Sequence, residues 1–320
     1  MRSTRIIIVN YRTATLVVDC LHSLLGDIRA EPDCRVVVVD NASGDGSVEH
    51  LTTAIRAAGW TWAEVMPLDR NGGFAFGNNA AIRPLLKSNE PPAYFHLLNP
   101  DTYIRPGAVT RLIDFLEEHP RVGLAGSTLE FPDGEPQRSA FRFHGILSEI
   151  ERGVRLGIVS KLLERWMVAP PRQRIAHRTD WLNGASMMIR REVFDRIGLM
   201  DDRFFLYYEE TDFCLRARRA GWPCWFVPTS RVVHLEGQST GATGAAARRK
   251  RVPQYWFDSR RRYFRKHHGA GYELLVNLAH AGSHAAWLFR KWLQFKEDED
   301  IPHYLRDFLR QTMTRHGNGS

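Results

Sequence analysis

The chain is 320 residues long, with 43% hydrophobic and 11% aromatic residues, which is enough apolar material for one large core or two modest ones. This composition excludes a disordered or fibrous protein. The net charge of +8 is local, because nine Lys and Arg stand against one acidic residue between Arg248 and His268 and the rest of the chain is neutral. A basic excess favours an acidic partner such as a nucleotide, a nucleic acid or an anionic membrane.

The four cysteines are widely spaced and include no Cys-x-x-Cys pair, so neither a zinc ribbon nor a disulfide framework is expected. A reducing cytosolic compartment fits this usage. No apolar run approaches the roughly 20 residues that span a bilayer, and the apolar stretch at residues 6–9 is too short for a signal peptide. We therefore expect a cytoplasmic protein, or one that lies on the inner face of the cell membrane.

The first part of the chain alternates strand and helix patterns. Strands are predicted at residues 5–10, 35–40, 62–68, 94–98 and 122–125, and helices at 14–25, 47–58, 77–86 and 106–119. This alternation with short connections predicts an α/β fold with a mostly parallel sheet covered on both faces. Such sheets bind ligands at the carboxyl ends of their strands.

The second part of the chain is less regular. Residues 131–178 contain four prolines and are predicted as loop and helix. Strands are expected again at 185–189, 224–227 and 232–234, with helices at 192–197 and 211–220, and three basic, aromatic helical segments follow at 251–267, 271–296 and 301–315. The pattern predicts an α/β domain at residues 1–245 and a basic amphipathic helical tail at 246–320.

Polar residues follow several of the predicted strands, where a ligand would bind. Asn10 and Tyr11 follow the first strand, Asp40 and Asn41 the second, and Asn99-Pro100-Asp101 the fourth. Asp40 either accepts hydrogen bonds from a base or ribose or caps the turn-rich segment after it. The sequence alone leaves both interpretations open.

Residues 71–79 form a glycine-containing loop before a predicted helix. Backbone N–H groups there can approach a diphosphate, although ordinary turn chemistry gives the same pattern. Neither GxGxxG nor GxxxxGK[ST] occurs in the chain. That counts against nicotinamide dinucleotide binding through the first fingerprint and against a P-loop ATPase.

Four carboxylates and one histidine are candidates for chemistry. Asp101 offers a hard ligand, and Mg²⁺ is usually held by one or two carboxylates together with ligand phosphates. Glu209, Glu210 and Asp212 stand at a predicted helix start, where they either stabilise the helix dipole or offer a base. His234 is a candidate ligand to the same cation or a structural histidine.

Taken in chain order, these segments resemble glycosyltransferase family 2, the inverting nucleotide-sugar enzymes with the GT-A fold, and especially its rhamnosyltransferase-like branch. The matching stretches are Ile7–Tyr11, Val38–Gly46, Asn71–Asn78, Leu98–Asp101, Trp181–Ser186, Phe205–Arg216 and His234–Ser239. They span about residues 5–240. The helical tail lies outside the resemblance.

The resemblance implies a role for each matched residue. The donor nucleotide would be bound by Asn10, Tyr11, Asp40, Asn41, Asn71, Gly73, Asn78 and Asn99. A divalent metal, Mg²⁺ or Mn²⁺, would be held by Asp101, the last position of a DXD-type motif, and His234. The acceptor side would include Asp180, Trp181 and Gly184, and the base would be Glu210, with Glu209 and Asp212 as alternatives.

Two positions depart from the family pattern. Asn99 is a neutral ligand at the first position of the DXD-type motif, and Glu210 is one carbon longer than the usual Asp. The implied function is transfer of a sugar, such as rhamnose from dTDP-rhamnose, to a hydroxyl of a glycan or lipid-linked acceptor in cell-surface polysaccharide synthesis. In this single displacement the base removes the acceptor proton while the cation neutralises the departing diphosphate, and the anomeric carbon inverts.

The tail carries an apolar helical stripe of Leu274, Leu278, Ala281, Ala285, Leu288, Trp292 and Phe295, spaced alternately by four and three. Together with the basic cluster, the stripe predicts a peripheral contact of residues 248–296 with an anionic membrane. Packing onto the catalytic domain or a homodimer contact would use the same stripe.

Two other classes of function compete with an enzyme. A nucleic-acid-binding protein would explain the basic aromatic segment Arg248–Lys266 but nothing in residues 5–240. A nonenzymatic sugar-nucleotide-binding module would not require Asp101, Glu210 and His234. We therefore expect an enzyme without a nucleic-acid partner.

Overall fold

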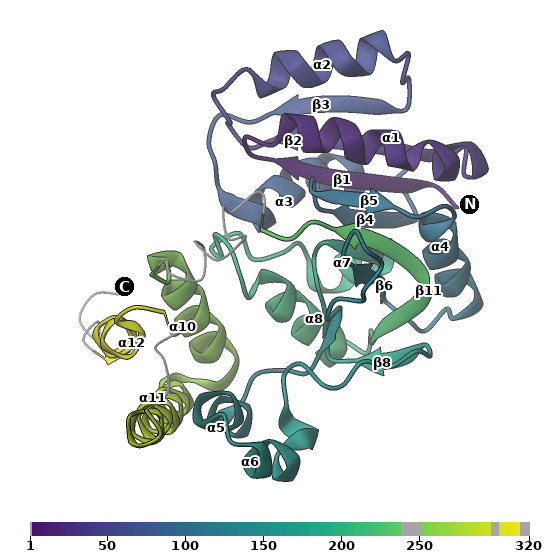
Figure 1. Ribbon diagram of the computed structural model, residues 1–320. Helices are drawn as coiled ribbons and strands as arrows, with labels where there is room; N and C mark the ends of the chain where they lie inside the picture. Colours follow the sequence, from purple (N-terminus) through teal and green to yellow (C-terminus); the bar gives the residue numbers. More distant parts are fainter. Residues whose placement is uncertain (1, 238–250, 296–300, 314–320) are drawn as a thin grey trace. The chain divides into compact units, whose positions relative to one another are not determined.

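The computed structural model describes residues 2–237, 251–295 and 301–313 and divides into two compact units (Figure 1). The sheet unit comprises Met1–Phe141, Arg172–Phe205 and Glu209–Ala242. The helical unit comprises Arg142–Pro171, Leu206–Tyr208 and Thr243–Ser320. The domain boundary expected at residue 245 lies outside the described residues, and the helical unit also takes in two segments from the middle of the chain.

The sheet unit is built on nine strands in the order β3-β2-β1-β4-β10-β6-β11-β5, with β8 paired to β11. The strands are β1 (Thr4–Asn10), β2 (Cys34–Asp40), β3 (Ala63–Pro67), β4 (Tyr94–Leu98), β5 (Thr102–Ile104), β6 (Leu124–Glu130), β8 (His177–Thr179), β10 (Ser186–Arg190) and β11 (Cys224–His234). Strands β3, β2, β1 and β4 are parallel, and so are β6 and β11, whereas β10 runs antiparallel between β4 and β6. The predicted mostly parallel α/β fold is confirmed.

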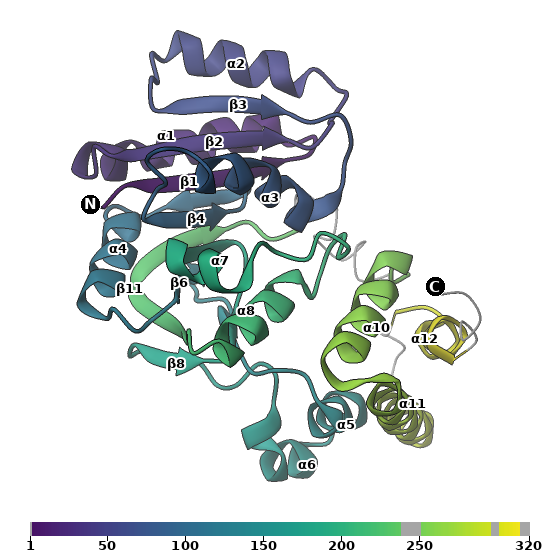
Figure 2. The same cartoon turned by 180° about the vertical axis from the view of Figure 1, so that it is seen from behind.

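Helices cover both faces of this sheet. They are α1 (Ala14–Ala30), α2 (Ser47–Ala57), α3 (Gly73–Leu86), α4 (Ala108–Glu118), α7 (Arg191–Ile197) and α8 (Glu209–Arg219). Helix α1 lies in front of the strands in Figure 1, and α3 and α7 lie in front in the reverse view of Figure 2. The β-branched run Ile6–Ile8 is fully buried, as expected for a strand covered on both sides.

The structure differs from the predicted elements where local signals compete. The two strands predicted at 224–227 and 232–234 form one strand, β11, whose register with β6 shifts between Val227 and Arg231. Pro228 lies in that irregularity, and its missing N–H explains the break in the ladder. The three-residue strand β5 was too short to predict. A two-stranded sheet pairs β7 (Ala140–Phe141), which lies in the region expected to be irregular, with β9 (Trp181–Leu182), which follows that region.

The helical unit consists of α5 (Ile146–Val154), α6 (Gly157–Leu162), a 3₁₀ turn (Glu164–Trp166), α10 (Gln254–His268), α11 (Ala270–Leu293) and α12 (Tyr304–Met313). Its interior holds a carboxylate, Glu149, whose Oε2 lies 2.8 Å from His280 Nδ1 and 3.3 Å from Arg260 Nη2. Burial alone would raise the pKa of Glu149, but Arg152 and Arg260 outweigh it and hold the pKa well below its usual value. The unit is therefore organised around a buried ion network.

Helix α11 buries mainly polar residues and exposes most of its large apolar ones. The buried residues include Glu273, Asn277, His280 and His284. The predicted stripe faces the other way, with Leu278 51%, Trp292 69% and Phe295 94% exposed. Among the helices that the structure describes, none combines the length and apolar character needed to cross a bilayer.

Several arginines of the basic cluster in the tail form ion pairs within the helical unit. Arg251 forms an ion pair with Asp307, Arg265 with Glu273, and Arg260 with Glu149. Because these acids lie outside residues 248–268, they neutralise part of a charge excess that looks unbalanced in the sequence. Residues 248–250 of the cluster lie outside the described residues.

Candidate active site

The predicted site residues of the first half gather at the carboxyl edge of the parallel strands. Asn10 ends β1 and Asp40 ends β2, and these two residues lie opposite each other in the register of the sheet. Strand β4 ends at Leu98, one residue before Asn99. The parallel order of β2, β1 and β4 thus brings three polar strand ends to one edge.

Asp40 is held in a buried turn network. Its Oδ1 accepts hydrogen bonds from Asn10 Nδ2 at 2.7 Å and Ser43 Oγ at 2.6 Å, and its Oδ2 accepts one from Ser43 N at 3.0 Å. The turn-capping interpretation of Asp40 is therefore realised. Tyr11 is half-buried beside this network, with the Arg12 guanidinium 5.2 Å from its ring centroid. The binding roles of Asn10, Tyr11 and Asp40 stay predictions.

The glycine loop is held by side-chain amides. Asn41 Nδ2 donates to Asn71 Oδ1 at 3.1 Å and to Gly73 O at 3.0 Å, and Asn71 Oδ1 also accepts the Gly73 N–H. Gly73 has φ +87°, and a Cβ there would lie 1.8 Å from Phe205 O. Only glycine fits this position, so the loop can lie against the backbone of Phe205.

Helix α3 starts at this loop, four residues earlier than the sequence predicted. Phe74 N donates to Phe205 O at 3.0 Å, which fixes the first turn of the helix. Asn78 is fully buried, and its Nδ2 donates to Phe74 O at 2.9 Å. Asn78 therefore stabilises the first turn of α3, next to the loop.

Asp101 and His234, the two residues predicted to hold a metal, lie close together. His234 Nε2 is 3.5 Å from Asp101 Oδ1 and 3.5 Å from Asn99 Nδ2. Asp101 is 2% exposed, and its Oδ1 has no hydrogen-bond donor among the described residues. A buried carboxylate oxygen in this state is costly unless a cation or donor reaches it.

The orientation of His234 is set by Gln137, a residue that sequence reasoning missed. Gln137 Nε2 donates to His234 O at 2.7 Å, so the amide oxygen is the atom 3.2 Å from His234 Nδ1. The Nδ1 position must then carry the proton, which leaves the Nε2 lone pair directed at Asp101 and Asn99. A second partner that fixes the tautomer is typical of metal-binding histidines.

Glu210 lies against the backbone of Gly184. Its Oε1 accepts the Gly184 N–H at 3.3 Å. A Cβ at Gly184 would lie 3.1 Å from Glu210 Oε1 and 3.0 Å from Phe74 Cζ. Burial raises the pKa of Glu210, offset in part by its own N–H and that of Gly184. A carboxylate with a raised pKa is a stronger base near neutral pH.

The two neighbouring carboxylates are placed differently. Asp212 is fully buried, and its Oδ2 accepts Arg216 Nε at 2.9 Å. Arg216 also donates to Ile197 O and Leu199 O, so this ion pair fastens α8 to the end of α7. Glu209 is 1% exposed. Glu210 accepts the Gly184 N–H, and the Phe74 ring lies close to the same glycine.

The residues predicted on the acceptor side continue from Gly184. Asp180 Oδ1 accepts Arg218 Nη1 at 2.6 Å, and the Trp181 ring stacks on Phe141 at 4.2 Å. Asn99 N donates to Ala185 O at 3.1 Å, which ties this segment to the loop of Asp101. Sequence reasoning missed Ser43, Gln137 and Phe205, and no periodicity or motif in residues 131–178 could have indicated Gln137.

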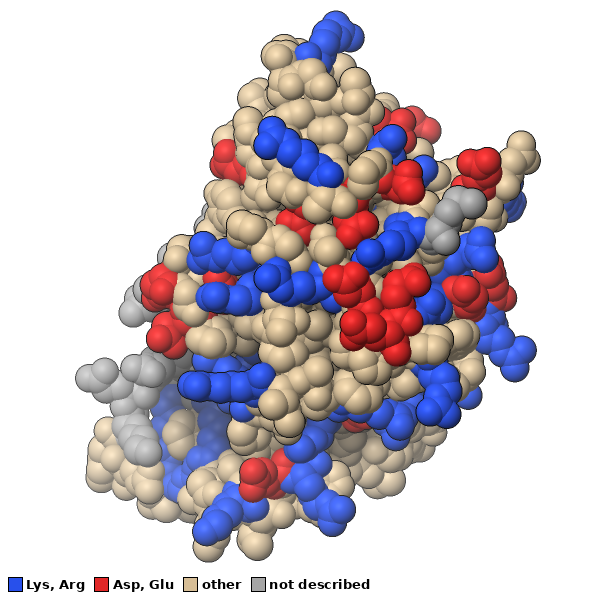
Figure 3. Space-filling model, turned by 90° about the vertical axis from the view of Figure 1, so that its right-hand side faces the viewer, with Lys and Arg blue, Asp and Glu red and all other residues tan. Residues whose placement is uncertain are grey.

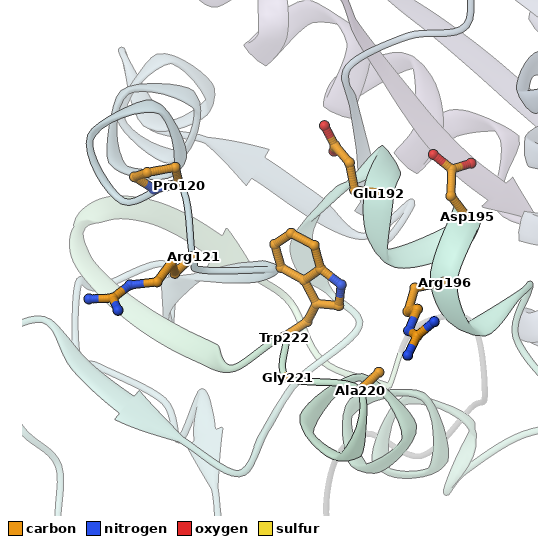
Figure 4. A pocket seen from close by; sticks show the side chains of 8 residues that line it. All are labelled: Pro120, Arg121, Glu192, Asp195, Arg196, Ala220, Gly221 and Trp222. Atoms are coloured by element: carbon orange, nitrogen blue, oxygen red, sulfur yellow. The ribbon is translucent and has the colours of Figure 1, made fainter.

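A surface pocket in the sheet unit contains none of these residues. It is lined by Pro120, Arg121, Glu192, Asp195, Arg196, Ala220, Gly221 and Trp222, with three of them on α7 and three just after α8 (Figure 4). Arg121 and Trp222 precede the starts of β6 and β11. The pocket thus lies at the amino ends of these parallel strands, at the opposite edge from Asn10 and Asp40.

Comparison with known proteins decides the family. The model of glycosyl transferase family 2 matches residues 5–198, more than half of the chain. The chain belongs to glycosyl transferase family 2. It is therefore a glycosyltransferase, and the expected family and enzyme class are confirmed.

Curated relatives of the glycosyltransferase include rhamnosyltransferases. It is 27% identical over 230 residues to the N-acetylglucosaminyl-diphospho-decaprenol L-rhamnosyltransferase of Mycobacterium tuberculosis, covering 68% of this chain and 72% of that protein. It is 28% identical over 169 residues to the rhamnosyltransferase WbbL of Escherichia coli K12, covering 51% of this chain and 60% of the relative.

Solved structures share the fold of the glycosyltransferase. The mannosyltransferase PcManGT from Pyrobaculum calidifontis, in complex with GDP-Man and Mn²⁺, aligns with a TM-score of 0.57 at 15% identity, covering 93% of this chain and 77% of that one. The S. aureus protein TarS, residues 1–349, aligns with a TM-score of 0.51 at 14% identity, covering 98% and 82%. The GT-A fold class is confirmed.

Proposed function

We propose that the glycosyltransferase moves rhamnose from dTDP-rhamnose to a hydroxyl of a lipid-linked glycan acceptor, with inversion, in cell-surface polysaccharide synthesis. The names of the relatives support the donor and acceptor classes, because one is a dTDP-rhamnosyl transferase of Shigella flexneri and another acts on N-acetylglucosaminyl-diphospho-decaprenol. The observation that carries the proposal is that Glu210 Oε1 accepts the Gly184 N–H, with the Phe74 ring close to the same glycine.

Glu210 acts as the general base in this proposal. An acceptor hydroxyl beside Gly184 gives its proton to a carboxylate oxygen of Glu210. At the same time, the acceptor oxygen attacks the anomeric carbon from the face opposite the diphosphate. The pKa of Glu210 is raised by burial, which favours proton uptake near neutral pH. Inversion follows because one displacement occurs on one face, and the activated diphosphate leaves without a general acid.

The residues around Asp101 fit a divalent cation. The Asp101 Oδ1 atom lacks a hydrogen-bond donor among the described residues, and the His234 Nε2 lone pair faces it. The structure groups no three His, Cys, Asp or Glu side chains of the described chain into a metal site, so the donor phosphates would supply the remaining ligands. Asp101 and His234 would hold Mg²⁺ or Mn²⁺, with Asn99 beside them, and a bound cation would neutralise charge on the diphosphate.

The donor nucleotide lies at the edge formed by Asn10, Tyr11, Asp40 and Asn41 in this proposal. The loop of Asn71 and Gly73 turns backbone toward the diphosphate, helped by the N-terminus of α3, and Asn78 stabilises the first turn of that helix. On the acceptor side, Asp180 and Trp181 shortly precede Gly184 in the chain. The stacked pair of Trp181 and Phe141 offers a flat apolar wall of the kind that packs against sugar rings.

The outward face of α11 is proposed to lie on a membrane that carries the acceptor. Its exposed residues are Leu274, Leu275, Leu278, Phe289, Trp292, Leu293 and Phe295, which together form an apolar surface on a helix whose inner face is polar. A helix of this kind lies in the boundary between headgroups and acyl chains, with Trp and Phe inserted. The exposed Lys161 and Arg165 follow α5, the helix packed along α11, and supply attraction to anionic headgroups.

A nucleic-acid partner is not supported by these observations. Three of the arginines in the segment Arg248–Lys266 that suggested it, Arg251, Arg260 and Arg265, form ion pairs inside the helical unit. On the face shown in Figure 3, basic and acidic side chains are interspersed. A polyanion requires a continuous basic surface instead.

The test of the base is the Glu210→Gln variant of the full chain, assayed for dTDP release from dTDP-L-rhamnose with a synthetic GlcNAc-diphospholipid acceptor. We expect turnover to fall by at least about 10²-fold, as for a lost general base, with donor affinity nearly unchanged because Gln keeps the shape and the Gly184 contact. Glu209→Gln is the matched control and should retain most of the turnover. Near-normal turnover of Glu210→Gln would instead move the base to Glu209 or Asp212.

A further inference from the structure

The segment directly before the proposed base is held by the helical unit. Leu206–Tyr208 belongs to that unit, although the residues on both sides of it belong to the sheet unit. Ser259 Oγ, on α10, donates a hydrogen bond to Leu206 O at 3.0 Å. Tyr208 is 6% exposed, and its ring centroid lies 5.1 Å from that of His144 and 5.4 Å from that of Tyr263. The chain then passes straight into α8, whose second residue is Glu210.

The backbone of this segment is strained. Tyr207 and Tyr208 both have φ +68°, in the left-handed region that bulky residues avoid. Bulky residues pay a steric penalty in this conformation, and such strain persists only where surrounding contacts enforce it. Tyr207 contributes one of these contacts, because its ring stacks on Tyr255 of α10 at 6.1 Å with an interplanar angle of 23°.

The surroundings of Tyr208 are rigid enough to enforce the strain. Arg260, one residue after Ser259, is 1% exposed and pairs with the buried Glu149. Glu149 also binds His280 of α11 and lies 3.6 Å from His144, which borders the Tyr208 ring. A buried network of this kind resists rearrangement, because breaking any one pair leaves a buried charge uncompensated.

We propose that Ser259 and Tyr208 are positioning residues for Glu210, holding Leu206–Tyr208 in the strained conformation that sets the first turn of α8. This inference rests on the proposed role of Glu210 as the base. Without the Ser259 hydroxyl, the two tyrosines relax toward ordinary backbone angles and Glu210 loses its alignment with the Gly184 N–H. Donor binding is retained, because the contact of Phe74 N with Phe205 O precedes the segment and lies within the sheet unit.

The first test compares Ser259→Ala with the wild-type chain in steady-state dTDP release from dTDP-L-rhamnose. One lost hydrogen bond plus relaxation of the strain should lower kcat about 5- to 10-fold, with donor KM changed less than about 2-fold. Ser259→Thr keeps the hydroxyl and should retain most of kcat. Ser283→Ala is the matched control, because Ser283 Oγ also donates to backbone oxygens in the helical unit, at Glu149 and His280, and does not bond to Leu206–Tyr208.

The second test repeats Ser259→Ala in the Glu210→Gln background. A residue that acts through Glu210 should have no further effect on kcat once the base is gone, whereas a general loss of structure lowers kcat equally in both backgrounds. Equal losses, or wild-type kcat in the Ser259→Ala single variant, would overturn the inference. Full activity of Glu210→Gln would overturn the proposed function itself, and the inference with it, so the two failures are distinguishable.

Discussion

His96 makes the stability of the sheet unit sensitive to acid. It lies in the middle of β4, fully buried, with Nε2 2.9 Å from Ser186 Oγ of β10 and with no hydrogen-bond partner for Nδ1 among the described residues. Protonation would place a charge and an unpaired N–H inside the core. Burial accordingly lowers the pKa of His96 from 6.5 to about 3.

The sign and size of the effect follow from this shift. The unfolded chain binds a proton at His96 below pH 6.5, whereas the folded chain does so only near pH 3, so stability is full above pH 6.5 and falls as the pH drops toward 3. The slope is about 1.4 kcal/mol per pH unit within that window. Between pH 7 and pH 5, His96 alone should therefore cost about 2 kcal/mol.

The perturbation is His96→Gln, which can keep a hydrogen bond to Ser186 without titrating. Hydrogen exchange of the β4 amides, read by mass spectrometry, reports the opening free energy of the sheet. Comparison of variant and wild type at each pH cancels the intrinsic exchange rates. Between pH 7 and pH 5, we expect the opening free energy of the variant to fall by about 2 kcal/mol less than that of the wild type. His50→Gln, at an exposed position, should behave as wild type.

An equal loss in His96→Gln and wild type would refute the reasoning, because it would mean that the folded sheet accepts the proton. The comparison also isolates His96 from His144 and His280, whose pKa values are likewise lowered by burial. Those two histidines lower the stability at acidic pH equally in both proteins, so their contribution cancels when the two proteins are compared.

Two further predictions concern the cation and the membrane. Asp101→Ala should abolish any metal-dependent part of donor binding, measured by titration of dTDP-L-rhamnose with Mn²⁺ or EDTA, and an identical wild-type titration with and without EDTA would exclude a metal role. Leu278→Asp and Trp292→Glu should each reduce co-sedimentation of the full chain with phosphatidylglycerol vesicles. The control Phe131→Glu changes an exposed aromatic residue of the sheet unit and should not reduce it. Equal pelleting of all forms would argue against the membrane contact.

The sequence predicted the parallel half of the fold well because each element there has its own local signal. The apolar runs of β1 and β2 and the amphipathic pattern of α1 are each complete within about 20 residues. The antiparallel insertion of β10 between β4 and β6 has no such signal, since it depends on partners about 60 and 90 residues away. The sequence predicts the strand itself, but not its position in the sheet.

The candidate site divides in the same way. Motif residues such as Asp101, His234 and Glu210 were identified from their order in the chain. Gln137 and Ser259 act on His234 and on the segment before Glu210 through contacts that only folding creates. The tail shows most clearly what the sequence leaves open. The apolar stripe of α11 can be predicted from its spacing, but the stripe faces outward because the polar residues on the other side of the helix surround the buried Glu149. A helix with two usable faces does not reveal from its sequence which one turns inward.

The position of β10 has a consequence for how the protein emerges from the ribosome. Strands β3, β2, β1 and β4 pair only with one another until residue 98, so they can assemble early through local contacts. The outer edge of β4 then stays unpaired until residues 186–190 are synthesised. During that interval the nascent chain exposes a strand edge open to wrong pairing, so β4 is the place where a chaperone would be most useful. Glu210 and His234 are added only afterwards, so the nascent chain acquires its proposed base after the residues of the proposed donor edge.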